Sequence, residues 1–416
     1  MKILLYTDLT IRPDQLFWHR DLGLLTKAFR DLGHEAYLVV HLATEPSPPP
    51  AISNELDHNR EQPCAVPQVR DVAGPHSEIR NSKSPTPPVL WPSPSDVRNP
   101  LWWQSHKPDL VILGLWTRPK YDPVRRAALF ATPHVIERAD SDGLRTASCG
   151  LLIYAKRRFD YFRDRTFRWP SPLSILASIF YSFASILATP WIEFRLKKTL
   201  ELLPSILVET PHATALWNSL ATRLGINPSK IHCIPHPIQT DIFKLDPAIQ
   251  KKNQIIAVGR WDSYQKNFPL LLKTLRAFLD KNPSWTSLVI GSGLPAKSPH
   301  PRITFLPPTS PVELAPLMQE SKIFLSSSRY ESFGLAAAEA TACGCAFVGP
   351  FVIPILNNES TPQNNSFLDS TFSLLAGKLQ DASKLEEPSS NQMKTALISS
   401  PQSSANLLLR LSVVSA

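Results

Sequence analysis

The hydrophobic positions alternate between short continuous runs and stretches of helical spacing. Residues 3–6 form an apolar run, residues 22–32 repeat apolar side chains every three or four positions, and residues 36–40 form another run. Continuous runs are typical of strands buried on both faces of a parallel sheet, whereas a three-to-four spacing is typical of a helix with one buried face. The opening therefore predicts a strand–helix–strand unit.

The same alternation continues along the first half of the chain and starts again in the second half. Further strands are predicted at residues 108–114, 135–136, 205–209 and 231–234, and a second series at 254–259, 287–290, 303–306, 323–325 and 346–348. Strands that alternate with helices build mostly parallel sheets, which bind ligands at the carboxyl ends of their strands. We therefore predict an α/β protein with two Rossmann-like domains whose sheets face each other across a cleft.

The strand–helix pattern and the local composition together predict the domain boundaries. The first domain is predicted at residues 1–235, a linker at 236–253 and the second domain at 254–383. Thirteen of the 41 prolines lie at residues 46–100, which show almost no apolar periodicity. Such a segment buries too little apolar surface to offset its ordering entropy, so we predict a long irregular insertion there. Residues 384–416, whose first part is rich in Ser, Gln and Asn, are predicted to be a polar tail.

Residues 169–192 contain no charged side chain. On a helix their side chains would form an apolar stripe (Leu173, Leu176, Phe180, Phe183, Leu187) and a serine stripe (Ser171, Ser174, Ser178, Ser182, Ser185). Predicted strands of one sheet lie on both sides of this segment, which argues against a membrane span. Two interpretations stay open: a helix buried in the first domain, or a helix on a membrane surface, held by the basic residues that flank it (Arg163, Arg165, Arg168, Arg195, Lys197, Lys198).

Charge and cysteine content narrow the expected partners. The net charge is +9, from 44 Lys and Arg against 35 Asp and Glu, which favours anionic partners such as phosphate-bearing ligands. A basic helix with interleaved aromatic residues is missing, so nucleic acid is not an expected partner. The five cysteines form no C-x-x-C pair. We expect free thiols, no metal, no cofactor and a cytoplasmic location, peripheral at the membrane if the second interpretation of the uncharged stretch holds.

The sharpest chemical signal lies at residues 330–340, after the apolar run 323–325. The alanine-rich second half favours a helix, which places Glu331 in the preceding loop, while Gly334 lets the backbone approach a ligand closely. The N-terminus of this helix would present free N–H groups that suit a phosphate. Glu331 would accept hydrogen bonds from sugar hydroxyls and Glu339 from a ribose. The alternative is a loop and helix with two solvated glutamates.

A second signal lies at residues 259–267, where the first strand of the second domain ends. Arg260 and Lys266 occupy a loop before a helix that Asn267 could cap. Two cations at the carboxyl end of a strand would hold a diphosphate and neutralise its charge as it leaves. The alternative is again a pair of solvated charges.

In this order and spacing, these segments resemble the group 1 glycosyltransferases of family four, which are retaining enzymes of GT-B fold. The segments that carry the resemblance are 259–267, 291–293, 328–339 and 342–345, with 236–243 similar to the interdomain link of the family. The resemblance is good over residues 205–350 and loose over 1–40 and 108–145.

The resemblance implies a role for each matching residue. Arg260 and Lys266 correspond to the pair that binds the donor diphosphate, and Glu331 to the glutamate beside the transferred sugar; these three are the expected catalytic residues. Glu339 corresponds to the ribose-binding glutamate. The other expected donor-binding residues are Gly259, Gly291, Ser332, Phe333, Gly334 and Leu335.

The sequence also departs from the family pattern. The usual Gly-Gly of the first loop is missing from residues 14–19, and Arg138 is near where a histidine is common. Asp140 and Asp142 follow it and either face the acceptor or form an Asx-type turn. Residues beyond 350 fit the family poorly.

The predicted function is transfer of a sugar from a nucleoside-diphosphate-sugar donor to an unidentified acceptor (a saccharide, a lipid-linked molecule or a protein), with retention of configuration. Two alternatives stay open. One is a catalytically silent binding or scaffold protein of the same fold, which the departures from the family pattern keep open, and the other is a nucleotide-sugar epimerase. Motifs of other enzyme classes, such as G-x-S-x-G or H-E-x-x-H, are missing from the sequence.

Overall fold

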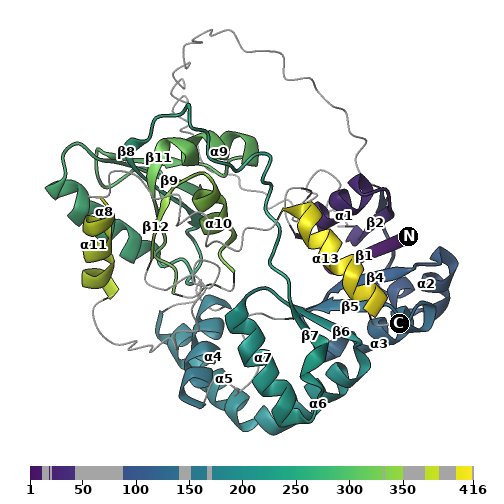
Figure 1. The fold of residues 1–416 in the computed structure, drawn as a ribbon. Helices are drawn as coiled ribbons and strands as arrows, with labels where there is room; N and C mark the ends of the chain where they lie inside the picture. The colour runs from purple at the N-terminus through teal and green to yellow at the C-terminus, as the bar shows by residue number, and fades with distance from the viewer. Residues whose placement is uncertain are drawn as a thin grey trace, which may run out of the picture.

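Two α/β domains lie side by side in the computed structural model (Figure 1). It describes residues 1–11, 18, 21–42, 88–139, 151–165, 171–329, 331, 333–349, 371–383 and 400–414. Within these ranges the first sheet has seven strands in the order β3-β2-β1-β4-β5-β6-β7, and the second has five in the order β10-β9-β8-β11-β12. Every pairing is parallel, as predicted.

The first domain is built on a sheet whose central strands are buried on both faces. Its strands are β1 (Lys2–Ile11), β2 (Glu35–Leu42), β3 (Val89–Leu90), β4 (Leu110–Gly114), β5 (Val135–Arg138), β6 (Ser205–Val208) and β7 (Ile231–Cys233). Its helices are α1 (Asp21–Asp31), α2 (Pro100–His106), α3 (Asp122–Ala131), α4 (Leu151–Arg165), α5 (Ser171–Leu187), α6 (Thr189–Leu202) and α7 (Pro211–Leu224). All five residues of β4 are buried, as its continuous apolar run predicts.

The caps of α7 follow from the sequence that bounds it. The side chain of Thr210 accepts a hydrogen bond from the N–H of Ala213, and Pro211 occupies the first turn. Gly225 ends the helix with a φ of 71°, a conformation that glycine adopts without steric cost. The residues that bound α7 therefore explain both of its ends.

The second domain has the same construction around a smaller sheet. Its strands are β8 (Lys252–Arg260), β9 (Thr286–Ser292), β10 (Ile303–Leu306), β11 (Ser321–Leu325) and β12 (Ala346–Val348). Its helices are α8 (Phe268–Lys281), α9 (Pro311–Glu320), α10 (Leu335–Ala342) and α11 (Thr371–Ala382). The predicted strands are therefore confirmed. Helix α9 begins with a capping box between Ser310 and Glu313.

The proline-rich insertion ends earlier than residue 100. Val89 and Leu90 form β3, which pairs with β2, and Val97 is buried in the core. The indole N–H of Trp103 donates to the carbonyl of Val97 at 2.9 Å. The apolar side chains among the prolines pack residues 88–100 onto the first domain, so the predicted end of the insertion at about residue 100 is wrong. Residues 46–87 lie outside the described part of the chain.

The end of the chain is not a polar tail throughout. Residues Pro401–Val414 form helix α13, which lies along α1 of the first domain (Figure 1). Ala405 and Leu408 are buried in the core of that domain, and the Ser404 hydroxyl donates to the carbonyl of Pro235 at 3.4 Å. The apolar side chains recur with helical spacing here, a short signal that the polar composition of the preceding residues obscures. The predicted tail is therefore wrong for residues 400–414.

The uncharged stretch contains the whole of α5 and the start of α6. Helix α5 ends at Leu187, and α6 begins at Thr189 with Pro190 in its first turn. Among the described residues, no single helix has the length and apolar character to cross a membrane. The pair Pro172–Leu187 and Thr189–Leu202 reaches that threshold only together, and it is bent by 64°. Proline at the start of α6 explains the break, because it has no N–H to continue the hydrogen-bonded ladder of α5.

Candidate functional site

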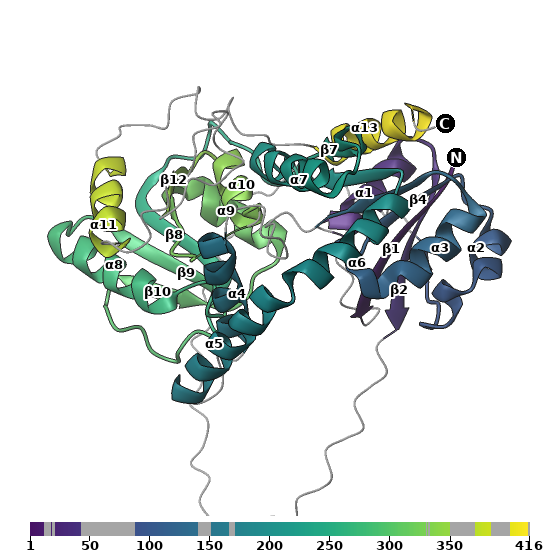
Figure 2. The same ribbon diagram turned by 90° about the horizontal axis from the view of Figure 1, so that it is seen from below.

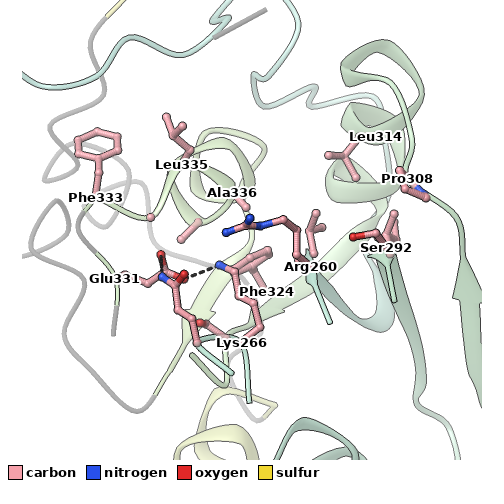
Figure 3. A pocket seen from close by; sticks show the side chains of 18 of the residues that line it. Arg260, Lys266, Ser292, Pro308, Leu314, Phe324, Glu331, Phe333, Leu335 and Ala336 are labelled. Carbon is pink, nitrogen blue, oxygen red and sulfur yellow. Dashed lines mark hydrogen bonds and ion pairs between the residues drawn. The ribbon is translucent and has the colours of Figure 1, made fainter. Parts of the chain in front are cut away.

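A cavity opens at the carboxyl ends of β8, β9 and β11 in the second domain (Figure 3). Its volume is about 540 Å³, within the range of small-molecule sites. It is lined by apolar side chains, including Leu314 and Phe324, and by the charged side chains of Arg260, Lys266 and Glu331. An apolar pocket with a few converging charged groups is the usual form of a ligand site.

Backbone rather than side chains forms the floor between β8 and β9. Gly259 and Gly291 are paired across the two strands, and Gly291 has a φ of 137°. A Cβ atom on Gly291 would lie 1.8 Å from the carbonyl oxygen of Gly259, which no side chain can accommodate. Glycine is therefore required at this position, and a ligand can approach the main chain there.

Arg260 is the last residue of β8, and its side chain extends into the cavity (Figure 3). It is exposed, and among the described residues its guanidinium forms no ion pair with a carboxylate. A guanidinium that no protein carboxylate neutralises can pair with an anionic ligand, because its planar fork matches two phosphate oxygens.

The structure brings the two predicted motifs into direct contact. The ammonium of Lys266 lies 2.6 Å from Oε1 of Glu331. The Ser328 hydroxyl donates to the same oxygen at 2.7 Å, and Nε2 of Gln265 lies 3.5 Å from Oε2. The side chains of Lys266 and Glu331 are 19% and 16% exposed, so both reach the cavity from partly buried positions. This arrangement fixes the carboxylate while leaving it accessible.

Asn267 joins the two loops instead of capping α8 through its side chain. It is the first residue before that helix, with a φ of 53°, but its side chain makes no capping hydrogen bond. Its Oδ1 accepts a hydrogen bond from the Arg329 guanidinium at 3.0 Å, and the N–H of Arg329 donates to the carbonyl of Gln265 at 2.8 Å. The predicted side-chain cap is therefore wrong. The amide instead holds the Lys266 loop against the Glu331 loop.

Helix α10 begins beside the same cavity. Gly334 precedes it with a φ of 83°, and the side chain of Phe333 is buried. The first N–H groups of an α-helix have no partner within the helix and carry its positive dipole end, so they suit an anion. Leu335 and Ala336, in the first turn of α10, line the cavity.

Most of the predicted site residues meet in this cavity. It is lined by Gly259, Arg260, Lys266, Gly291, Glu331, Phe333, Gly334 and Leu335. Glu339 lies further along α10, past Ala337, and is not among the described lining residues. Ser332, Asp140 and Asp142 fall outside the described residues.

A comparison with protein families finds a match in the second domain. Residues 252–358 match the family model described as glycosyl transferases group 1. The second domain is therefore similar to the group 1 glycosyltransferases over these residues. The matched residues include β8, β9, β11 and α10, which surround the cavity.

A relative of known activity matches part of the chain. GDP-mannose:cellobiosyl-diphosphopolyprenol alpha-mannosyltransferase of Xanthomonas campestris is 25% identical over 144 residues, which cover 32% of this chain. The same protein of Xanthomonas oryzae pv. oryzae matches at the same identity and over the same share. The chain spans only 36% of the length of these curated relatives.

Solved structures share the fold over a larger part of the chain. Sucrose-phosphate synthase of Thermosynechococcus elongatus has a TM-score of 0.53 at 14% identity and covers 99% of this chain and 98% of its own. The pneumococcal O-GlcNAc transferase GtfA, in complex with UDP and GlcNAc, has a TM-score of 0.51 at 14% identity and covers 76% of this chain and 59% of its own. These likenesses confirm the predicted GT-B fold.

A largely buried charged cluster that the motifs did not reveal lies at the edge of the first sheet, beside the second domain. Arg138 ends β5, Glu209 follows β6 and His236 follows β7. The two carboxylates of Asp21 and Glu209 each lie beside His236, and Arg138 is 3.8 Å from the first and 3.6 Å from the second. The sequence could have predicted this cluster, because charged residues at or just after the ends of neighbouring parallel strands meet at one edge of the sheet.

His236 connects this cluster to the cavity. Its ring packs edge-on against the ring of Phe333, with the centroids 5.3 Å apart, and it also lines the cavity. Phe333 lies just before α10, so the edge of the first sheet supports the loop that leads into that helix. His236 stands in the segment that resembles the interdomain link, which gives the link a contact with the site.

His236 gives a pH-dependent contribution to stability. Burial lowers its pKa, but the carboxylates of Glu209 and Asp21 outweigh burial and Arg138 and raise the pKa to about 9. The ordinary value is about 6.5, so folding favours the protonated ring. Its contribution is complete below about pH 6.5 and is lost as the pH rises through about 9.

We expect His236→Gln to reduce the fall in unfolding free energy between pH 6.5 and pH 9.5, measured by urea denaturation at each pH. The neutral amide keeps much of the side-chain volume but cannot titrate. His300→Gln is a matched control, because His300 lies 3.3 Å from the exposed Asp280, remote from this cluster. An equal change in both variants would show that the contacts of His236 with Asp21 and Glu209 do not cause the pH dependence of stability.

Proposed function

We propose that the chain is a glycosyltransferase that transfers a sugar from a nucleoside-diphosphate-sugar to an acceptor with retention of configuration. The observation that carries the proposal is the pairing of Lys266 with Glu331 beside the guanidinium of Arg260, inside a cavity of the second domain. This supports the proposal because cations suit a diphosphate and a carboxylate suits sugar hydroxyls.

Each group has a distinct part in the proposed reaction. The diphosphate of the donor would lie between Arg260 and the N-terminus of α10, with the Lys266 ammonium on the same side. Negative charge grows on the diphosphate as the sugar leaves, and preorganised cations stabilise that charge more than they stabilise the bound donor. Glu331, oriented by Ser328, would accept hydrogen bonds from the transferred sugar.

The proposed neutralisation of the leaving diphosphate uses side chains and helix N–H groups, so we propose a reaction that needs no metal. Glu339 would bind the donor ribose after a small movement of α10 or its loop, since it lies outside the cavity as described.

The relatives act on different donors, which limits the proposal to a donor class. The Xanthomonas relative is named for GDP-mannose, and the GtfA structure contains UDP and GlcNAc. Both donor systems have a nucleoside diphosphate in common, which is the part that Arg260 and Lys266 would recognise. The base and the sugar would contact the less charged walls of the cavity.

A panel of GDP-, UDP- and ADP-sugars tests the proposal. The cognate donor should raise the melting temperature by mass action and should release nucleoside diphosphate on turnover. The double variant Arg260→Ala/Lys266→Ala should show neither effect, while Arg276→Ala/Lys273→Ala on α8 should behave as wild type. Neither of these two α8 side chains lines the cavity among its described residues.

The products separate the competing functions. Transfer or slow hydrolysis of one sugar, with retained anomeric configuration, supports the proposal. Binding without turnover by any donor would favour the silent binding protein, and an altered sugar still attached to its nucleotide would favour the epimerase.

A further inference from the structure

Four serines of the α5 stripe are buried: Ser174, Ser178, Ser182 and Ser185. Ser174 and Ser178 are fully buried, and the Ser178 hydroxyl donates to the carbonyl of Ser174 at 2.6 Å. From α4, the Arg158 guanidinium donates to the Ser185 hydroxyl at 3.1 Å, and Arg163 donates to the Ser174 hydroxyl. The polar side of α5 therefore packs on α4, which forces its apolar side outward.

Large apolar side chains are exposed along α5 and at the start of α6. These side chains are between 40% and 67% exposed. We call this set the α5–α6 face; its members are Leu173, Ile175, Leu176, Ile179, Phe180, Tyr181, Phe183, Leu187, Trp191 and Phe194. The interpretation of the uncharged stretch as a core helix is wrong, because the apolar stripe of α5 is exposed. Gathered apolar side chains of this kind usually mark an interaction surface.

Positive charge borders this face at its α6 end. The ammonium of Lys198 lies 4.3 Å from the ring centroid of Phe194, and the guanidinium of Arg195 lies 5.5 Å from that of Trp191. In the described part of the chain, neither cation forms an ion pair with a carboxylate, whereas Glu193 and Glu201 of α6 are paired with Arg223 and Lys197. The border of the face is therefore cationic.

We propose that the α5–α6 face docks on an anionic lipid bilayer. Exposed Leu, Phe and Trp side chains enter the boundary between headgroups and acyl chains, and cations beside them pair with lipid phosphates. The absence of charge from residues 169–192 fits an apolar medium, whereas the border of a protein interface is usually polar. Figure 2 shows α6 running from the first domain to α5, whose far end projects away from both domains.

The docking surface is physically connected to the proposed donor site. Helix α4 packs against α5 and also contacts Tyr264 in the loop that carries Lys266. The Tyr264 hydroxyl lies 3.5 Å from Oδ1 of Asp160, and the guanidinium of Arg163 lies 5.2 Å from the ring centroid of Tyr264. If the proposed transferase activity holds, docking would bring the cavity close to the bilayer, and the acceptor would be a membrane-anchored molecule.

The first test measures co-sedimentation with phosphatidylcholine vesicles that contain phosphatidylserine. Leu176→Ser/Phe180→Ser/Phe183→Ser should weaken binding at least about tenfold, because each substitution removes apolar area that the bilayer would bury. The matched control Leu101→Ser/Phe130→Ser/Val312→Ser removes equally exposed apolar side chains from α2, α3 and α9, and it should bind as wild type. Both variants should keep wild-type circular dichroism, since all six residues are more than half exposed.

The second test addresses the cations. Each basic residue near an anionic surface contributes about 1 kcal/mol, which is about fivefold in binding. Arg195→Glu/Lys198→Glu should therefore weaken binding at least about twentyfold, and Arg276→Glu/Lys281→Glu on α8, with the same change in net charge, should have a much smaller effect. Binding should also fall at high salt and on vesicles without phosphatidylserine.

The outcomes separate this proposal from the proposed function, because vesicle binding needs no donor and no turnover. Failure of the wild type to bind anionic vesicles at low salt would overturn the docking proposal, whatever the transfer assay shows. A concentration-dependent dimer that the serine variant abolishes would also overturn it, in favour of a second copy of the chain. Vesicle binding by a chain that turns over no donor would leave docking supported and refute the transferase.

Discussion

Lys266→Ala is expected to lower sugar transfer by about 10²–10³-fold, the usual effect of removing one preorganised group that stabilises transition-state charge. The ammonium of Lys266 lies 2.6 Å from Oε1 of Glu331, so the substitution also removes one of the groups that orient that carboxylate. Because the loss concerns charge that develops as the donor breaks, it should appear in kcat more than in KM. Steady-state kinetics with the cognate donor measure both constants.

The control for this prediction is a second ion pair of the same domain. Lys252 lies 2.7 Å from Glu320, and its side chain is 60% exposed. Lys252→Ala should leave kcat unchanged, because an exposed ion pair contributes at most about 1 kcal/mol to stability and this one lies outside the cavity. Wild-type turnover in Lys266→Ala would contradict the assignment of the donor site.

Glu339 should behave differently from Lys266 if it binds the ribose. The ribose does not change during transfer, so Glu339→Ala should weaken donor binding with little effect on kcat. The comparison also tests whether α10 moves when donor binds, since Glu339 lies outside the described cavity. An unchanged KM in this variant would refute the ribose assignment.

The sequence predicted the parts of the fold and site that depend on local pattern. Buried parallel strands appear as continuous apolar runs, so β1, β4 and β8 could be located before the structure was known. Motifs that follow neighbouring strands of one sheet must meet at its carboxyl edge, and β8 and β11 are neighbours, which explains why Lys266 and Glu331 were both found.

Other features of the fold and site depend on contacts between segments that are distant in sequence, so the local sequence pattern could not predict them. The sequence predicts that the serines of α5 form one stripe of an amphipathic helix. Only the packing of α5 on α4 shows that this stripe is the buried side. Helix α13 packs on α1 from the opposite end of the chain. Asn267 is of a residue type that often caps helices, yet its side chain binds Arg329 because a second loop lies beside it.

The largest effect on stability is expected from the buried ion pair between Arg125 of α3 and Glu137 of β5. Both side chains are fully buried, and Nε and Nη2 of Arg125 each lie 2.6 Å from a Glu137 oxygen. The N–H of Thr117 donates to the same carboxylate at 2.7 Å. The pair lies in the first domain, and neither residue belongs to a motif of the family.

Arg125→Leu should lower the unfolding free energy of the first domain by about 3–5 kcal/mol, because it leaves the Glu137 carboxylate buried without its cation. Arg125→Leu/Glu137→Leu should recover much of that loss, since it removes the uncompensated charge. Arg223→Leu is the matched control: Arg223 lies 2.6 Å from Glu193 but is 43% exposed, so its loss should cost at most about 1 kcal/mol. Urea denaturation followed by circular dichroism measures all three. A double variant no more stable than Arg125→Leu would show that the arginine acts through its packing and its contact with Asp122 rather than through the charge of Glu137.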